Sequence, residues 1–112
     1  MYILNRETIE GLLNDVDLSS LISKGFIAYS SGQVVVPPIG ELTFKDPPGD
    51  VHIKYGYIIG DKYYVIKIAS GFWKNEEYGI SNGQGMMLLF NQNTGVPEAI
   101  LNDEAILTDI RT

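Results

Sequence analysis

Two lysines and a histidine carry most of the chemistry that this sequence suggests. His52 and Lys54 precede a turn at Gly60-Asp61, and Lys67 follows it in a segment that is apolar on both faces of a predicted strand. A two-residue turn with glycine first suits type II′ geometry and predicts that Lys54 lies directly opposite Lys67. Like charges opposite each other destabilise a sheet, so this pair needs a compensating group. An anion held between the two lysines would supply it.

A purely structural role is the alternative for both lysines. Lysine is seldom fully buried without a partner, so Lys54 or Lys67 could form a salt bridge with Glu41 or Glu98. A long stem could also carry the charge to the surface. The chain has 8 Lys and Arg against 14 Asp and Glu, a net charge of −6. In such an acidic chain, cations gathered on one face favour an anion pocket.

Several other kinds of site are excluded or disfavoured. The chain has no cysteine, which removes disulfides, thiolate metal sites and a thiol nucleophile. His52 is the only histidine, so a multi-histidine metal site is excluded and we predict no metal. Gly83-Gln84-Gly85 lacks the third glycine of a dinucleotide fingerprint and is interpreted as a turn. The negative net charge opposes binding to nucleic acid or to an anionic membrane.

The length and the N-terminus indicate the class of protein. A chain of 112 residues has the usual size of one domain. The apolar start Met1-Tyr2-Ile3-Leu4 is far too short for a signal peptide or a membrane span. We therefore expect a single soluble domain over residues 1–112, located in the cytoplasm.

The elements that position these residues are two helices followed by strands, which predicts an α+β fold with a mostly antiparallel sheet. Apolar residues at helical spacing predict helices over Arg6–Asn14 and Asp17–Ser30, with Asn5 and Asp17 as caps. Runs of β-branched residues between turn residues predict six strands: Gln33–Val36, Glu41–Phe44, Val51–Ile59, Tyr63–Ser70, Met86–Phe90 and Glu98–Leu101.

Two loops and the end of the chain complete the prediction. Gly71–Gly85 reads as a long loop in which Trp73 packs or lines a binding surface. Asn91–Gly95 reads as a hairpin loop whose glycine takes positive φ. Thr108 is a possible cap for a helix with room for only about one turn, which is unstable in isolation. This predicts that the chain is truncated and that its parent continues beyond Thr112.

Four motifs stand in order along most of the chain. They are Gly49-Asp50-Val51-His52-Ile53-Lys54, Val65-Ile66-Lys67-Ile68-Ala69-Ser70-Gly71-Phe72, Thr94-Gly95 and Leu107-Thr108-Asp109-Ile110-Arg111-Thr112. Their order and spacing resemble the N-terminal half of the ornithine cyclodeaminase and mu-crystallin family. The resemblance implies the substrate-binding and dimerisation half of a two-domain NAD(P)-dependent enzyme. We expect the nucleotide-binding Rossmann domain of that family to be absent from this chain.

The resemblance also implies roles for single residues. In the family, the lysine that matches Lys67 and the arginine that matches Arg111 bind the substrate carboxylate. That lysine also lies beside the reacting carbon, so the resemblance makes Lys67 the catalytic candidate. Lys54 is the third substrate-binding candidate. Ornithine-specific members tend to hold an acidic residue at that position, and a lysine suits a second anionic group better than an ammonium group. The arginine that many members place near Pro37 is not found, because Pro38-Ile39-Gly40 occupies that position.

Three functions follow from the resemblance. In the first, the parent enzyme acts on an amino acid or cyclic imino acid by cyclodeamination, alanine dehydrogenation or imine reduction with NAD or NADP. The present chain is then expected to bind no cofactor and to be inactive alone. The alternatives are a mu-crystallin-like small-molecule binding protein and a stand-alone dimerising module without catalysis. We expect a homodimer, and a small anionic amino-acid or imino-acid substrate for the enzyme.

Overall fold

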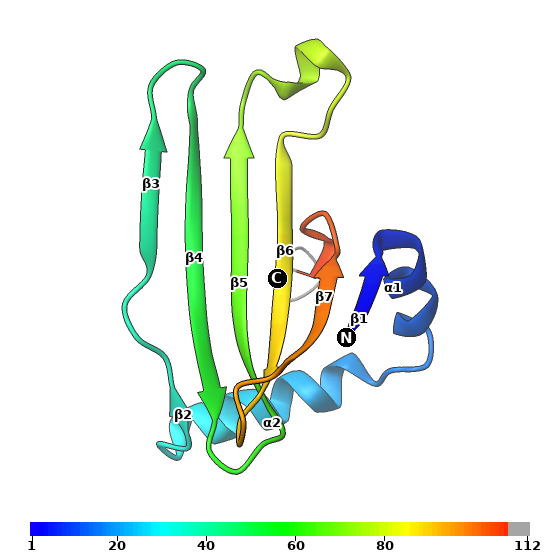
Figure 1. The fold of residues 1–112 in the computed structure, drawn as a ribbon, viewed down its shortest axis with the longest axis vertical. Coiled ribbons are helices and arrows are strands. Elements are labelled where there is room, and N and C mark those ends of the chain that lie inside the picture. Colours follow the sequence, from blue (N-terminus) through cyan, green and yellow to red (C-terminus); the bar gives the residue numbers. More distant parts are fainter. Residues whose placement is uncertain (108–112) are drawn as a thin grey trace.

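The computed structural model describes residues 1–107 and has one sheet of seven strands at its centre. In chain order the elements are β1 (Tyr2–Asn5), α1 (Arg6–Leu13), α2 (Leu18–Ser30), β2 (Val34–Val35), β3 (Gly40–Phe44), β4 (Gly49–Ile58), β5 (Tyr63–Phe72), the 3₁₀ turn η1 (Asn75–Tyr78), β6 (Gly83–Asn91) and β7 (Pro97–Asn102). The strand order is β1-β7-β6-β5-β4-β2, and β3 also pairs with β4 (Figure 1). Only the pairing of β1 with β7 is parallel, so the predicted α+β fold with a mostly antiparallel sheet is confirmed.

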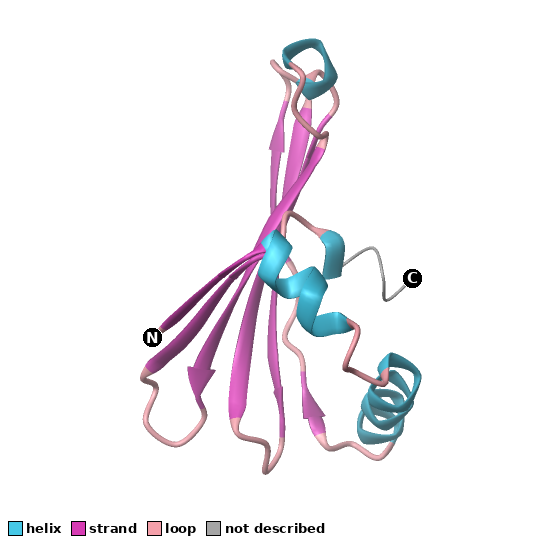
Figure 2. Cartoon of the chain, turned by 90° about the vertical axis from the view of Figure 1, so that its right-hand side faces the viewer, coloured by secondary structure: helices cyan, strands magenta, loops and turns pink. Residues whose placement is uncertain are grey.

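The two faces of the sheet differ in what covers them. Both helices lie on one side, the inner face, and no element of the described chain covers the other side, the outer face (Figure 2). One row of paired residues crosses five strands of the inner face as Leu4, Leu101, Met87, Lys67 and Lys54. The neighbouring row on the outer face is entirely apolar and consists of Ile3, Ile100, Leu88, Ile66 and Tyr55.

Both predicted helix caps are confirmed. The Asn5 side chain accepts a hydrogen bond from the Thr8 backbone N–H, and Asp17 accepts one from that of Ser20. Helix α1 buries Ile9 and lies against β1 and β7, whereas α2 buries none of its residues. Within residues 1–107, no helix combines the length and the apolar character that crossing a membrane requires.

Strand β1 differs from the sequence prediction, which places no strand before the first helix. Tyr2–Asn5 pairs in parallel with Ala99–Asn102 at the other end of the described chain. A four-residue strand shows little periodicity, and its partner is too distant in sequence for a hairpin signal. The strand therefore forms because β7 offers a free edge, which a local pattern does not reveal.

The predicted loop Gly71–Gly85 is wrong at both ends. Strand β5 continues to Phe72 and β6 begins at Gly83, so the connection covers only residues 73–82. The interpretation of Gly83 and Gly85 as turn residues is also wrong, because both lie in β6. A Cβ atom on Gly85 would lie 2.8 Å from the carbonyl oxygen of Ile68, so this glycine permits close approach of β5 and β6.

Gly83 and Gly85 make a matched pair for testing that packing. We expect Gly85→Ala to lower the free energy of unfolding by about 1–3 kcal/mol, because backbone atoms must shift to admit the methyl group. Gly83→Ala should change it by less than about 1 kcal/mol, since no atom lies within 4 Å of the added Cβ. Urea unfolding of both variants measures the difference. Equal losses in the two variants would show that the close approach at Gly85 is unimportant.

Candidate functional site

The β4–β5 hairpin brings the two predicted lysines together. Lys54 pairs directly with Lys67, as the sequence predicts. The turn itself differs: the Asp61 N–H donates to the Ile58 carbonyl at 3.0 Å, so Gly60, with φ +83°, is the third turn residue rather than the second. That position matches a type II turn instead of type II′. The change of turn type leaves the predicted pairing of the lysines intact.

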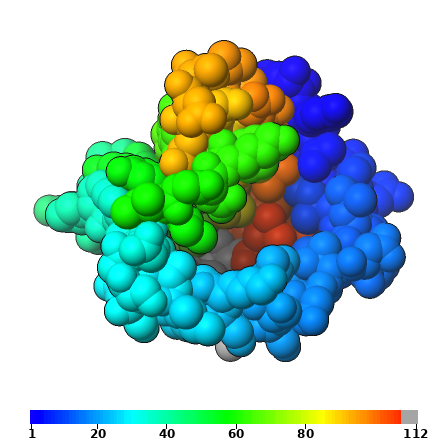
Figure 3. Space-filling view, turned by 90° about the horizontal axis from the view of Figure 1, so that it is seen from below, coloured from blue at the N-terminus to red at the C-terminus, as the bar shows by residue number. Residues whose placement is uncertain are grey.

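The two lysines line one pocket of about 260 Å³ on the inner face. The aliphatic side chains of Val36, Val65, Met87 and Leu107 also line this pocket, so apolar walls surround two cationic groups. Both lysines are half-buried. Viewed from the end that carries α2, the molecule is hollowed between this helix and the β4–β5 hairpin (Figure 3). Met87 and Leu107 were not predicted as pocket residues, because the β5–β6 pairing places Met87 and the turn after β7 places Leu107, and no sequence motif specifies either.

Glu41 and Glu98, the possible salt-bridge partners of the two lysines, interact with other residues. Glu41 lies opposite His52, with 3.6 Å between its Oε1 and the histidine Nε2, and Asp50 Oδ2 lies 4.0 Å from the same nitrogen. Glu98 accepts a hydrogen bond of 3.4 Å from the Asn91 amide. The Lys54 side chain forms no ion pair or hydrogen bond with any residue in 1–107. The salt-bridge alternative is therefore wrong for Lys54.

A buried carboxylate supports the floor of the pocket. Asp103 is only 1% exposed, and its Oδ2 accepts a hydrogen bond of 3.1 Å from the N–H of Leu107, which lines the pocket. The Asp103 backbone carbonyl accepts another hydrogen bond from the Ile106 N–H, while Asp103 Oδ1 is buried and has no hydrogen-bond partner among residues 1–107. Glu104 and Ala105 have φ values of 51° and 71°, an unfavourable conformation for residues with side chains. The sequence analysis missed this turn because it placed the cap later, at Thr108.

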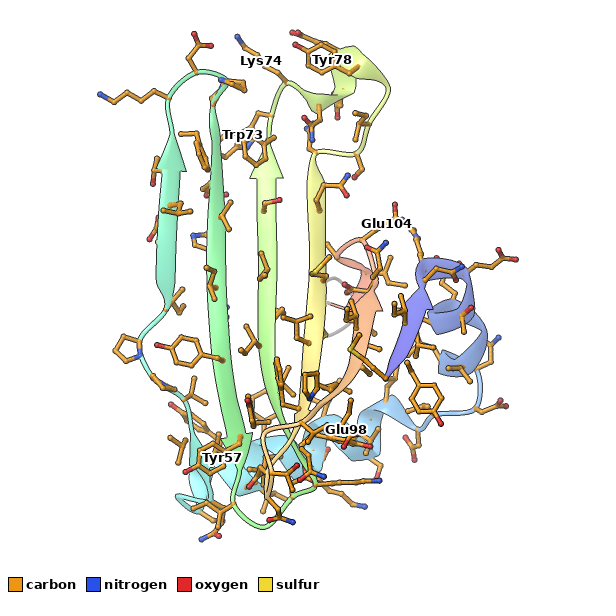
Figure 4. The ribbon with its side chains drawn as sticks, viewed as in Figure 1. Tyr57, Trp73, Lys74, Tyr78, Glu98 and Glu104 are labelled. Carbon is orange, nitrogen blue, oxygen red and sulfur yellow. The ribbon has the colours of Figure 1, made fainter. Side chains whose placement is uncertain are left out.

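The remaining candidate residues lie apart from the pocket or outside the described chain. Arg111 and Thr108 fall outside residues 1–107. Trp73 and Tyr78 lie beyond the end of the sheet that is remote from Tyr57 (Figure 4). Both aromatic side chains are largely exposed, which disfavours the packing alternative for Trp73 and leaves a binding surface as a prediction.

The described residues do not fit a dinucleotide. Such a site needs a glycine-rich turn between a strand and the N-terminus of a helix, where backbone N–H groups meet the phosphates. Gly83 and Gly85 instead lie within β6, and the loop before them contains only one 3₁₀ turn. In residues 1–107 no three His, Asp or Glu side chains are placed to hold a metal ion.

Comparison with known proteins gives the same family as the sequence motifs. The family model for the ornithine cyclodeaminase/mu-crystallin family matches residues 1–112. The chain belongs to this family. A Rhizobium meliloti (strain 1021) protein named "putative dehydrogenase" is 34% identical over 113 residues, which cover 100% of this chain and 34% of that protein. The chain thus spans about a third of the length of this relative.

Two solved structures share the fold of this chain. The Thermococcus litoralis Δ¹-pyrroline-2-carboxylate reductase, in complex with NADH and L-proline, superposes with a TM-score of 0.84 at 20% identity, covering 99% of this chain and 34% of that one. An archaeal alanine dehydrogenase dimer with bound NAD gives 0.85 at 23% identity, covering 99% and 33%. At these identities the comparison establishes the fold of the chain.

Proposed function

We propose that this chain is the substrate-binding and dimerisation part of an NAD(P)-dependent enzyme that acts on an amino acid or cyclic imino acid. The observation that carries the proposal is the pairing of Lys54 with Lys67 in one pocket with aliphatic walls. Membership of the ornithine cyclodeaminase/mu-crystallin family supports the reaction class. A reductase that binds NADH and L-proline is among its structural relatives.

In this proposal the pocket binds and orients the substrate. The Lys67 ammonium group neutralises the α-carboxylate, aided by Arg111, and keeps the neighbouring carbon in position. Half-buried charges attract an anion more strongly than exposed ones, because the aliphatic walls lower the local dielectric constant. Hydride transfer belongs to the nicotinamide when it is bound, and we expect residues outside this chain to hold it.

Loss of the Lys67 charge tests the proposal. Sodium sulfate, compared with sodium chloride at equal ionic strength, should raise the melting temperature of the chain in a saturable way, because binding to the folded state stabilises it. Stabilisation is about 2.7 kcal/mol at a hundred times the dissociation constant. Lys67→Met should abolish this response, since it keeps the apolar stem but removes the positive charge that binds the anion.

Lys74→Met provides the matched control. This lysine is exposed in the loop at the far end of the sheet, so its loss changes the net charge equally without touching the pocket (Figure 4). The control variant should respond to sulfate like the unmodified chain. A full sulfate response in Lys67→Met would contradict the proposal.

The outer face of the sheet supports the dimerisation part of the proposal. A compact monomer of 12.4 kDa is expected to expose about 6,100 Å², whereas this chain exposes 7811 Å². The exposed strand residues include Ile3, Val35, Leu42, Phe44, Tyr55 and Tyr57, all on the outer face. A stable interface covers about 800 Å² on each partner, which this face can supply.

A further inference from the structure

We infer that the substrate of this pocket is a short dicarboxylic amino or imino acid and that Lys54 binds its second carboxylate. The inference rests on the proposed function, in which Lys67 binds the first carboxylate. It adds the substrate class and makes Lys54 the residue that determines specificity.

The position of Lys54 is fixed by the sheet. It lies on β4 directly opposite Lys67 on β5, and both side chains line the same pocket. Directly paired residues in an antiparallel sheet have Cα atoms about 4.5–5.5 Å apart. The two ammonium groups therefore extend from neighbouring points on the same wall, and two anionic groups a few carbon atoms apart can each reach one of them.

The charges near Lys54 favour an external anion. The carboxylates of Glu41 and Asp50 are close to His52 instead, and Lys54 has no ion pair within residues 1–107. A half-buried ammonium group without a counter-charge is costly, and a facing cation raises that cost. A monocarboxylate adds one negative charge to this pair of cations, whereas a dicarboxylate adds two.

The aliphatic pocket walls indicate the chemistry of the chain that joins the two carboxylates of the ligand. Val36, Val65, Met87 and Leu107 are aliphatic and offer no side-chain hydrogen bonds. A basic side chain such as that of ornithine would bring a third cation toward Lys54. A short aliphatic chain between two carboxylates matches both the walls and the charges of the pocket.

Succinate and butyrate separate one carboxylate from two, because both have a four-carbon skeleton. We expect calorimetric titration of the 112-residue chain at constant ionic strength to give at least ten-fold tighter binding of succinate. Lys54→Met should lower succinate affinity to near that of butyrate and weaken butyrate binding much less. Lys54→Arg should keep the preference for succinate, because it keeps the charge. Lys67→Met should weaken both ligands.

The outcomes distinguish this inference from the proposed function. Equal affinity for succinate and butyrate, or an unchanged preference in Lys54→Met, overturns the dicarboxylate assignment, while butyrate binding that depends on Lys67 still supports an anion site. Binding of neither acid overturns both. If Lys54→Met fails to fold by circular dichroism, Lys54→Gln replaces it, because a polar amide of similar length removes only the charge.

Discussion

Tyr55→Glu is expected to convert the chain from a dimer to a monomer at micromolar concentration. Tyr55 lies in the apolar row of the outer face and is 42% exposed. In a two-fold interface one substitution places two carboxylates in the contact, and each loses water without gaining a partner. We expect the dissociation constant for dimerisation to rise at least a hundred-fold, measured by sedimentation velocity across a concentration series.

Tyr78→Glu is the control for that experiment. Tyr78 is an exposed tyrosine in η1, beyond the end of the sheet, so the same change of side chain should leave the dimer intact (Figure 4). A clean monomer of the unmodified chain, or a Tyr55→Glu variant that stays dimeric, would show that the outer face does not mediate self-association.

Asp103→Ala is expected to lower the free energy of unfolding by about 1–3 kcal/mol, because a partly buried N–H loses its acceptor. The affected donor is the N–H of Leu107, so the floor of the lysine pocket should loosen as well. Urea unfolding measures the first effect, and the response of the melting temperature to sulfate measures the second.

Asp103→Asn separates the hydrogen bond from the charge. The asparagine side chain still offers one oxygen to the Leu107 N–H, and it removes the buried carboxylate whose Oδ1 has no hydrogen-bond partner in the described part of the chain. We expect it to retain most of the stability that Asp103→Ala loses. Equal destabilisation by the two substitutions would show that the negative charge itself is required.

Local signals in the sequence were sufficient for the parts of the fold that depend on neighbouring residues. Asn5 and Asp17 cap helices because their side chains reach N–H groups three residues ahead. The pairing of Lys54 with Lys67 follows from one hairpin, and even the wrong turn type preserved it. Side-chain alternation then places both lysines on one face, which predicts the main pair of the candidate site.

The remaining features depend on contacts between distant segments. Gly85 resembles a turn residue until the approach of the Ile68 carbonyl is known, because the same residue type suits a turn and a close strand pairing. The pocket wall at Leu107 depends on the turn after β7, where Glu104 and Ala105 adopt positive φ. Neither residue is a glycine, so the sequence contains no signal that predicts this turn. Arg111 lies outside the described residues, so its place beside Lys67 stays a prediction.

The parallel pairing of β1 with β7 imposes an order on biosynthesis. Residues Tyr2–Asn5 leave the ribosome first, but their partner Pro97–Asn102 is made only after every other strand of the sheet. During translation β1 therefore has no edge to join, and β6 remains an open edge until β7 is complete. Open edges recruit strands from other chains. Nascent chains arrested before Pro97 should therefore need chaperones more than completed ones do.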